Sequence, residues 1–305
     1  MNGRILGVSA GSPRGNAEIV LREALAAAAA DGAHVELLRL DALDLPNSAD
    51  PGQSGDAWWL WDQLLDADGL IISAPILSRV IPARLKLLVD VLLGPNADAA
   101  IVARILAMRA AGEEPVFAFR ADERVLRPRV AGFIAVGGSL TPQWKSLALP
   151  TMHLLTFSMQ TAVVDQFVIS GAGTPKSVVL DEDALKRAAE LGRNVAAELG
   201  RTFEEAEYHG DPGACPLCHL DIVELRGRSV QCATCGARGE LRDDFTVHWT
   251  DLRTSVISVP EKDAHFEEIL DTARRHAELR ATVQQRAAAY ATDDLVIHPP
   301  THEKG

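Results

Sequence analysis

The chain has 305 residues, of which 47% are hydrophobic and 24% charged, proportions that are ordinary for a globular protein of one large domain or two. Its formal net charge of −12 argues against a nucleic-acid-binding surface. No uncharged apolar run is long enough to cross a bilayer, and residues 1–4 do not resemble a signal peptide, so we expect a cytoplasmic protein without a membrane partner.

A buried strand is predicted over residues 4–10 and an alanine-rich helix over residues 17–30, with a polar, glycine-bearing loop between them. The free N–H groups and the dipole at such a helix start favour an anion. Ser12 and Asn16 offer side-chain donors, and Arg14 offers a fork that suits phosphate. The alternative is an ordinary turn, since the loop matches neither the Walker A nor the G-x-G-x-x-G pattern.

The loop resembles the phosphate loop of the flavodoxin-like NAD(P)H-dependent FMN reductases and iron–sulfur flavoproteins. That loop reads G-S-P-R, a short spacer, then G-N-T or S-N-T, and here residues 11–17 read GSPRGNA. Alanine replaces the last hydroxyl, so one phosphate hydrogen bond of the family is expected to be missing. The resemblance implies that the FMN phosphate is held by Ser12, Arg14, Gly15, Asn16 and Ala17.

A second strand is predicted over residues 34–40, followed by a loop over residues 41–55 that is rich in Asp, Pro, Gly and Ser. Iron–sulfur flavoproteins carry a cysteine cluster in this region. No cysteine is present here, so we expect no iron–sulfur cluster. Asp56 is a candidate cap for a helix through residue 66, whose tryptophans belong to the core or, alternatively, to an aromatic wall for a flat substrate.

Residues 69–75 form the strongest predicted strand, apolar as in a parallel strand covered on both faces, and Pro82 opens the next helix. The stretch over residues 67–92 resembles the second flavin loop of the same family. The positions that match are Ala67, Asp68, Gly69, Pro75, Val80, Ala83, Leu85, Lys86 and Asp90.

The resemblance implies flavin contacts on this second loop from Pro75, Ile76, Leu77, Ser78 and Arg79. The last three residues replace a Tyr-Phe-Gly sequence of the family, so the isoalloxazine ring loses an aromatic partner. In one interpretation Arg79 reaches toward the flavin or the substrate. In the other it is a solvated loop arginine.

The next segment has no counterpart in this resemblance, and we treat it as an insertion. Residues 97–111 are predicted to be helical, and residues 115–119 are a candidate extra strand. Residues 120–129 are strongly charged, so we expect an exposed, solvated loop there.

A fourth apolar strand is predicted over residues 130–136, and Gly137, Gly138 and Ser139 follow it directly. Glycine lets the backbone approach a ring edge closely. The resemblance places the pyrimidine side of the flavin at this third loop, and the alternative is a plain turn. Trp144 either borders the pocket or covers the loop.

A fifth strand is predicted over residues 161–169, and a helix that starts at residues 181–183 runs to about residue 199. His153, alone on an intervening helix, is expected to be structural. The alternation of strands and helices predicts an α/β fold with a doubly wound parallel five-stranded sheet, and the resemblance implies that this sheet is flavodoxin-like. All three candidate loops then lie at the carboxyl ends of strands, where such sheets bind ligands.

Two C-x2-C pairs, Cys215 with Cys218 and Cys232 with Cys235, flank a predicted hairpin that turns at Gly227. Four thiolates in this spacing predict a zinc ribbon. Because cysteine fills every position, the Zn2+ is expected to be structural. The competing interpretation is iron in a rubredoxin-like electron relay.

One or two further strands are predicted between residues 241 and 259, and residues 261–290 form a long, polar helix that packs on the ribbon or on another subunit. We therefore expect an FMN-binding domain at 1–205, a zinc ribbon at 210–245 and an extension of strands and helix at 246–305.

The resemblance implies an FMN-dependent oxidoreductase that passes hydride from NADH or NADPH through FMN to a quinone, a free flavin or another small acceptor. Because the cofactor carries this chemistry, we name no catalytic acid or base. The alternative is a flavodoxin-like electron carrier, or a scaffold that recruits a partner through its ribbon. A homo-oligomer, dimer or tetramer, is expected in either case.

Overall fold

The chain folds into two compact units, Met1–Lys262 and Asp263–Gly305. Most of the loop predicted at 41–55 and the centre of the strand predicted at 115–119 lie outside the described residues. The computed structural model describes residues 3–46, 55–94, 96–115, 119–291 and 297.

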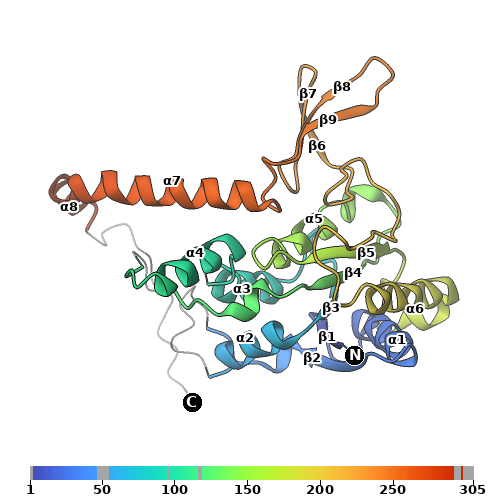
Figure 1. Ribbon diagram of the computed structural model, residues 1–305. Helices are drawn as coiled ribbons and strands as arrows, with labels where there is room; N and C mark the ends of the chain where they lie inside the picture. The colour runs from blue at the N-terminus through green and yellow to red at the C-terminus, as the bar shows by residue number, and fades with distance from the viewer. Residues whose placement is uncertain (1–2, 47–54, 95, 116–118, 292–296, 298–305) are drawn as a thin grey trace. The chain divides into compact units, whose positions relative to one another are not determined.

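The first unit is built on a five-stranded parallel sheet with the order β2-β1-β3-β4-β5 (Figure 1). This order confirms the predicted flavodoxin-like, doubly wound sheet. The central strands are almost fully buried, as their apolar sequences predict. The strands are β1 Arg4–Ser9, β2 His34–Arg39, β3 Gly69–Pro75, β4 Val130–Val136 and β5 Ala162–Ile169.

Helices cover both faces of this sheet (Figure 1). Helices α1 and α6 share one buried cluster with Ile5, Ile71 and Ile134, whereas α2, α3, α4 and α5 share the other with Leu6, Ile72 and their neighbours. A side chain at position 192 would clash with a carbonyl of α1, so glycine permits α6 to pack closely there. The helices are α1 Asn16–Ala30, α2 Ala57–Asp66, α3 Ala83–Leu92, α4 Ala99–Ala110, α5 Ala148–Met152 and α6 Glu182–Ala197.

Short 3-10 turns connect several of these elements. They are η1 Leu40–Ala42, η3 Glu123–Leu126, η4 Pro142–Trp144, η5 His153–Leu155, η6 Ser177–Leu180 and, in the second unit, η7 Ala288–Tyr290.

Two local predictions about α2 and the charged loop differ from the structure. Asp56 occupies the N-cap position of α2, but its carboxylate accepts from the Asp44 N–H at 2.6 Å and caps no helix N–H. Arg129, predicted to be solvated, is 1% exposed and donates to the backbone carbonyls of Ala67 and Leu65, each at 3.0 Å. Hydrogen bonds to backbone carbonyls that are distant in the sequence compensate for the loss of water around this guanidinium. The tryptophan Trp61 is fully buried, as the core interpretation predicts.

The cysteine region forms a four-stranded antiparallel sheet with the order β6-β7-β8-β9 (Figure 1). Gly227, with φ +64°, provides the predicted turn between the first two strands. Residues 256–259 were expected to be a strand, but residues 256–258 form a turn and Val259 begins α7, because Pro260 suits the first turn of a helix. The strands are β6 Val223–Arg226, β7 Ser229–Cys232, β8 Arg238–Leu241 and β9 Val247–Asp251.

The second unit contains most of α7, Val259–Glu278, and all of α8, Arg280–Ala287. The single predicted helix is therefore interrupted at Leu279, which is the N-cap of α8. Leu279 and Val283 are about half exposed and Tyr290 is 87% exposed. Among the described residues, no helix combines the length and apolarity that a membrane span requires.

Candidate functional site

The structure brings the three predicted loops together at the carboxyl edge of the sheet. The Ala10 N–H donates to the Ser73 carbonyl at 3.0 Å, which joins the first loop to β3. The Ile76 N–H donates to the Val136 carbonyl at 2.8 Å, which joins the second loop to β4. Gly11 packs so closely that an added Cβ would lie 3.3 Å from Pro75. The three predicted loops are thus adjacent along this edge of the sheet.

The first loop leaves the start of α1 open. Gly15 is the N-cap of this 15-residue helix, and within the described part of the chain no side chain caps it. The Gly15 N–H donates to the Ser12 carbonyl at 3.0 Å, and a Cβ at Gly15 would crowd that carbonyl. The side chains of Ser12 and Arg14 are exposed. An uncapped helix start beside a hydroxyl and a guanidinium fits a phosphate group.

Glu18 stabilises this loop by accepting a hydrogen bond from its backbone, and no sequence motif pointed to this residue. Its side chain is fully buried and accepts from Arg39 at 2.7 and 2.8 Å, from Arg22 at 2.8 Å and from the Arg14 N–H at 3.1 Å. The hydrogen bonds from Arg39 are the main reason why the pKa of Glu18 falls to about 2. The last of these contacts holds Arg14 at φ 58°, in the left-handed region.

The Asn16 side chain, which was expected to donate to a phosphate, instead forms hydrogen bonds with the backbone of the protein. Its Nδ2 donates to the carbonyls of Ala172 and Thr174 at 3.0 and 2.8 Å, and its Oδ1 accepts from the Val178 N–H at 3.1 Å. The amide therefore fastens the segment after β5 to the first loop. Ala17 is 3% exposed and packs into the core. At both positions the backbone N–H is the group that a phosphate would meet.

The second loop closes with a tight two-residue turn. The backbone groups of Leu77 and Val80 exchange hydrogen bonds at 2.9 and 3.1 Å, and the central residues Ser78 and Arg79 have φ values of 49° and 80°. Positive φ at both central positions is the requirement of a type I′ turn, which ordinarily selects Asn or Gly. The Arg79 Nε donates to the Gln143 carbonyl at 2.7 Å. Arg79 therefore joins the second loop to the third.

The third loop keeps its backbone close to two neighbouring segments. The Gly137 N–H donates to the Ile169 carbonyl at 2.8 Å, and its carbonyl accepts from the Ala172 N–H at 3.1 Å. An added Cβ at Gly138 would lie 2.8 Å from the Gly173 Cα, so only glycine fits there. Gly138 is exposed, whereas Gly137 is buried. The Ser139 hydroxyl accepts from the Thr141 N–H at 3.2 Å and so shapes the loop.

Large apolar side chains are exposed on the second and third loops. Leu77 is 55% exposed, Leu140 is 77% exposed and Trp144 is 57% exposed. We call these three residues the apolar rim. Lys145, in the same segment, donates to the Ser170 hydroxyl. The edge therefore combines apolar surface with cationic side chains, a combination that suits a planar molecule bearing an anionic group.

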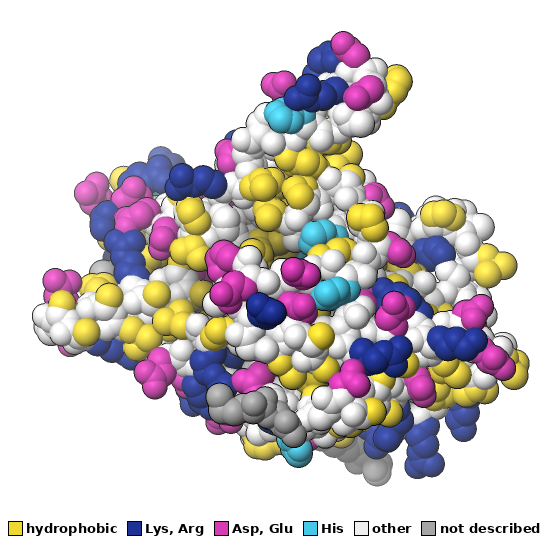
Figure 2. Space-filling model, turned by 45° about the vertical axis from the view of Figure 1, so that its right-hand side comes forward, with side chains coloured by type: hydrophobic (Ala, Val, Ile, Leu, Met, Phe, Trp, Pro, Cys, Tyr) yellow, Lys and Arg dark blue, Asp and Glu magenta, His cyan; other side chains and the backbone are white. Residues whose placement is uncertain are grey.

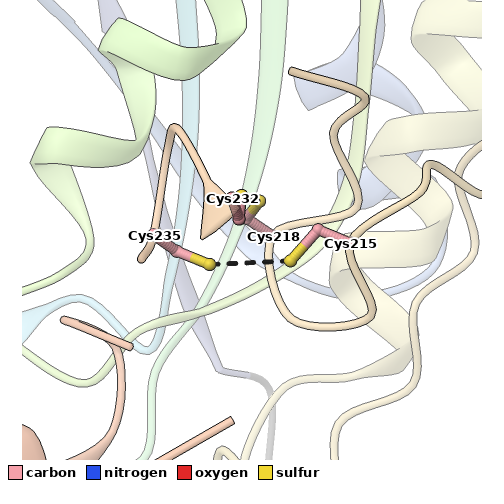
Figure 3. A group of neighbouring side chains, drawn as sticks. All are labelled: Cys215, Cys218, Cys232 and Cys235. Carbon is pink, nitrogen blue, oxygen red and sulfur yellow. Dashed lines mark hydrogen bonds between the residues drawn. The ribbon is translucent and has the colours of Figure 1, made fainter. Parts of the chain in front are cut away.

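The four cysteines converge in the ribbon (Figure 3). Their sulfurs all lie within 4.8 Å of one another, with Cys215 to Cys235 and Cys218 to Cys232 each at 3.5 Å, and all four residues are buried. The Cys215 sulfur and burial raise the pKa of the Cys218 thiol, because thiolates repel one another without a cation. Four thiolates at this separation fit a tetrahedral metal ion.

A buried polar chain anchors the first knuckle to the sheet. The Gln166 Nε2 on β5 donates to the Cys218 carbonyl at 2.8 Å, and the Gln166 Oε1 contacts the His153 Nε2 at 2.8 Å. Burial lowers the pKa of His153 to about 4, so this imidazole is neutral. His153 thus has a place in the packing of the sheet against the knuckle. Trp249 of β9 donates to the Ala214 carbonyl at 2.8 Å and closes the other side.

Comparisons with known proteins found relatives of both the sequence and the fold. The family model of NADPH-dependent FMN reductases matches residues 4–174. The chain is 37% identical over 258 residues to a flavone synthase, cfoJ, of Aspergillus candidus, and the match covers 78% of each protein. The solved structure of a flavone reductase superposes with a TM-score of 0.81 and 27% identity, covering 98% of this chain and all of that one.

Proposed function

The chain belongs to the NADPH-dependent FMN reductase family, and from this premise we propose that it passes hydride from NADPH through bound FMN to a planar aromatic ketone. Bound FMN accepts two electrons as hydride and then returns them to an acceptor. The observation that carries the proposal is the meeting of three loops at the carboxyl edge of the sheet, the first of which opens an uncapped helix.

Different loops of the chain bind the phosphate and the ring of FMN. The phosphate is held by the side chains of Ser12 and Arg14 and by the backbone N–H groups that begin α1, among Gly15, Asn16 and Ala17. The ring lies against the second loop, Pro75, Ile76, Leu77, Ser78 and Arg79, and its pyrimidine side meets the third loop, Gly137, Gly138 and Ser139. These assignments follow from the resemblance of the three loops to those of the family, and the contacts that bring the loops together support them.

The acceptor is proposed from the apolar rim together with the names of the relatives. Leu77, Leu140 and Trp144 offer exposed apolar area beside the predicted ring position. Two similar proteins are named for flavone chemistry. Flavones and quinones are both flat, conjugated ketones, so one apolar rim suits either class. Such an acceptor would stack over the ring, while the rim keeps water away from it.

The four-cysteine site is proposed to hold one structural Zn2+ per chain, because all four positions of the tetrahedron are cysteine sulfurs. Iron in the same site would make the ribbon an electron relay. Metal analysis of the purified protein separates the two, and a red ferric–thiolate colour would replace the zinc proposal.

We also keep the proposal of a homo-oligomer, dimer or tetramer. In the second unit Leu279, Val283 and Tyr290 expose apolar surface that a neighbouring subunit would cover. The alternative of an electron carrier or scaffold receives no support from the relatives, which are enzymes.

The test is steady-state oxidation of NADPH by the FMN-loaded protein under anaerobic conditions, with flavone, a benzoquinone and free FMN as separate acceptors. We expect turnover with at least one of the two ketones and slower turnover with NADH. Leu140→Glu, which places a charge in the apolar rim, should raise KM for the ketone more than KM for NADPH. Turnover with free FMN alone would contradict the proposed acceptor, and no turnover with any acceptor would contradict the proposed function.

A further inference from the structure

A cavity lies where the ribbon meets the sheet, away from the three loops. Its volume is about 460 Å³, within the range of small-molecule sites. The surface is hollowed beneath the ribbon, where hydrophobic and histidine side chains gather (Figure 2). The residues that line it come from the start of β5, the segment that follows α6, the first cysteine knuckle and the start of α7.

The cavity and the predicted flavin site lie at opposite ends of the parallel sheet. Ala162 and Val163, which line the cavity, are the first two residues of β5, whereas the loops follow the carboxyl ends of the strands. A strand of this length spans about 25 Å. A molecule in this cavity therefore cannot be the electron acceptor at the loops, and the cavity has to be explained separately.

Aromatic rings form much of the wall. Phe203, Tyr208 and His219 all line the cavity. The rings of Tyr208 and His219 stack with their centroids 3.6 Å apart and their planes 9° apart. Apolar side chains, including Leu217 and Val259, complete the wall. Such a surface favours a flat aromatic ligand that packs face or edge against the rings.

The side chain of Gln160, which lines the cavity, is held in place by a hydrogen bond from a buried lysine. Gln160 has φ 51°, in the left-handed region, and its Oε1 accepts from Lys262 Nζ at 2.6 Å. Lys262 is 6% exposed, and burial lowers its pKa to about 8. Gln160 lines the cavity, and because its oxygen is engaged, its NH2 group is the part of the amide that a ligand oxygen would use. That group would donate to a carbonyl or ether oxygen of a ligand.

The charge of the lining selects against anions. Among the described residues that line the cavity, Glu204 is the one Asp, Glu, Lys or Arg side chain. A carboxylate at the wall repels an anionic ligand. The Tyr208 hydroxyl and the Ser258 hydroxyl already donate to the Asp211 and Arg253 carbonyls.

We propose that this cavity is a second ligand site, which binds a neutral, planar aromatic molecule with a carbonyl or ether oxygen directed at Gln160. The site does not depend on the identity of the electron acceptor. It does depend on the metal, because Pro216, Leu217 and His219 belong to the first cysteine knuckle or follow it directly. Occupation of the site would hold the knuckle, the start of α7 and the edge of β5 together.

The test uses prodan, a neutral naphthyl ketone whose emission shifts to the blue in an apolar site, titrated into the FMN-loaded protein. Val259→Trp fills the cavity, and Val256→Trp is the matched control because it lies three residues earlier, is 41% exposed against 42% for Val259, and lines no part of the cavity. We expect Val259→Trp to weaken one class of prodan site by at least about tenfold and Val256→Trp to leave that class within about twofold.

Ala206→Phe, which fills the cavity from another wall, should reproduce the loss if Val259→Trp folds poorly by circular dichroism. NADPH turnover should be unchanged in all three variants, since none lies at the loops. Equal prodan binding by wild type and both cavity-filling variants would overturn the proposal. So would a wild-type oligomer that binds no prodan and that Val259→Trp dissociates, because the occupant would then be a second copy of the chain.

Discussion

Glu18 is a buried carboxylate whose partners decide its charge and, through it, the shape of the phosphate loop. Its folded pKa of about 2 lies below its ordinary value of 4.5, mainly because of the hydrogen bonds from Arg39. The ionised form is therefore stabilised by folding. A depressed pKa contributes stability that is fully present above pH 4.5 and is lost as the pH falls toward 2.

We predict that Glu18→Gln lowers the free energy of unfolding by on the order of 3 kcal/mol at pH 7, because the variant has no carboxylate whose pKa falls from 4.5 to about 2 and because two arginines lose their charged partner. The difference from wild type should shrink between pH 4.5 and pH 2. Urea unfolding at several pH values measures both. Glu23→Gln, an exposed site on the same helix, is the matched control. A difference that does not change with pH would contradict this account.

Arg14 tests the phosphate assignment directly. Arg14→Ala should weaken FMN by about 10- to 100-fold, the effect of losing a charge-assisted hydrogen bond, and should leave riboflavin nearly unchanged. Fluorescence titration of both flavins into apoprotein gives the two affinities. Arg14→Lys, which keeps the charge, should lose less. Equal loss of FMN and riboflavin would remove this loop from the phosphate site.

The contacts of individual side chains in the first loop were only partly predictable from the sequence. The G-S-P-R-G-N pattern located the loop, because local turn chemistry is written in adjacent residues. It could not reveal that the Asn16 amide binds backbone 156 to 162 residues away. Nor did any pattern mark Glu18, because its main partner, Arg39, lies 21 residues away at the end of β2.

At the scale of elements, the parallel strands were predictable because each is a short apolar run that has to be buried on both faces. The limits were set by tertiary contacts. Arg129 lies in a stretch whose charge predicts a solvated loop, yet the end of α2 and Ala67, directly after it, supply its backbone acceptors. The long helix is interrupted at Leu279, although the sequence there contains no proline or glycine that would predict a break.

The turn of the second loop carries local strain that a single substitution should relieve. Ser78 adopts φ 49°, a region that costs an L-residue about 1 kcal/mol or more and costs glycine little. Ser78→Gly should therefore raise the free energy of unfolding by up to about 1 kcal/mol. Arg79→Gly relieves similar strain but removes the bond to Gln143, so its gain should be smaller. Thermal unfolding of both variants decides this, and destabilisation by Ser78→Gly would refute the strain.

The ribbon is expected to depend on metal while the flavin site does not. A module with few buried residues gains much of its folding free energy from the metal. Cys232→Ser should release the metal and abolish the high-affinity prodan site, yet leave FMN affinity within about twofold. Metal content, prodan binding and flavin content measured on one preparation test this. Loss of all FMN from a variant that is folded by circular dichroism would mean that the ribbon builds part of the flavin site.

At the scale of the whole molecule, the structure assigns different tasks to its parts. The carboxyl edge of the sheet presents the three loops that are proposed to bind FMN, and the ribbon, joined to β5 through Gln166, shapes a cavity at the opposite end. A net charge of −12 does not prevent binding of an anionic cofactor, because local backbone dipoles and arginines set the field within the loop.

This chain is proposed to be an FMN-dependent oxidoreductase. The most direct measurement is an anaerobic titration of the FMN-loaded protein with NADPH, followed through the visible absorbance of oxidised flavin. We predict that one FMN per chain is bleached by one equivalent of NADPH and that a planar aromatic ketone restores the absorbance. Protein that binds no FMN, or whose bound FMN keeps its absorbance with excess NADPH, would contradict the account.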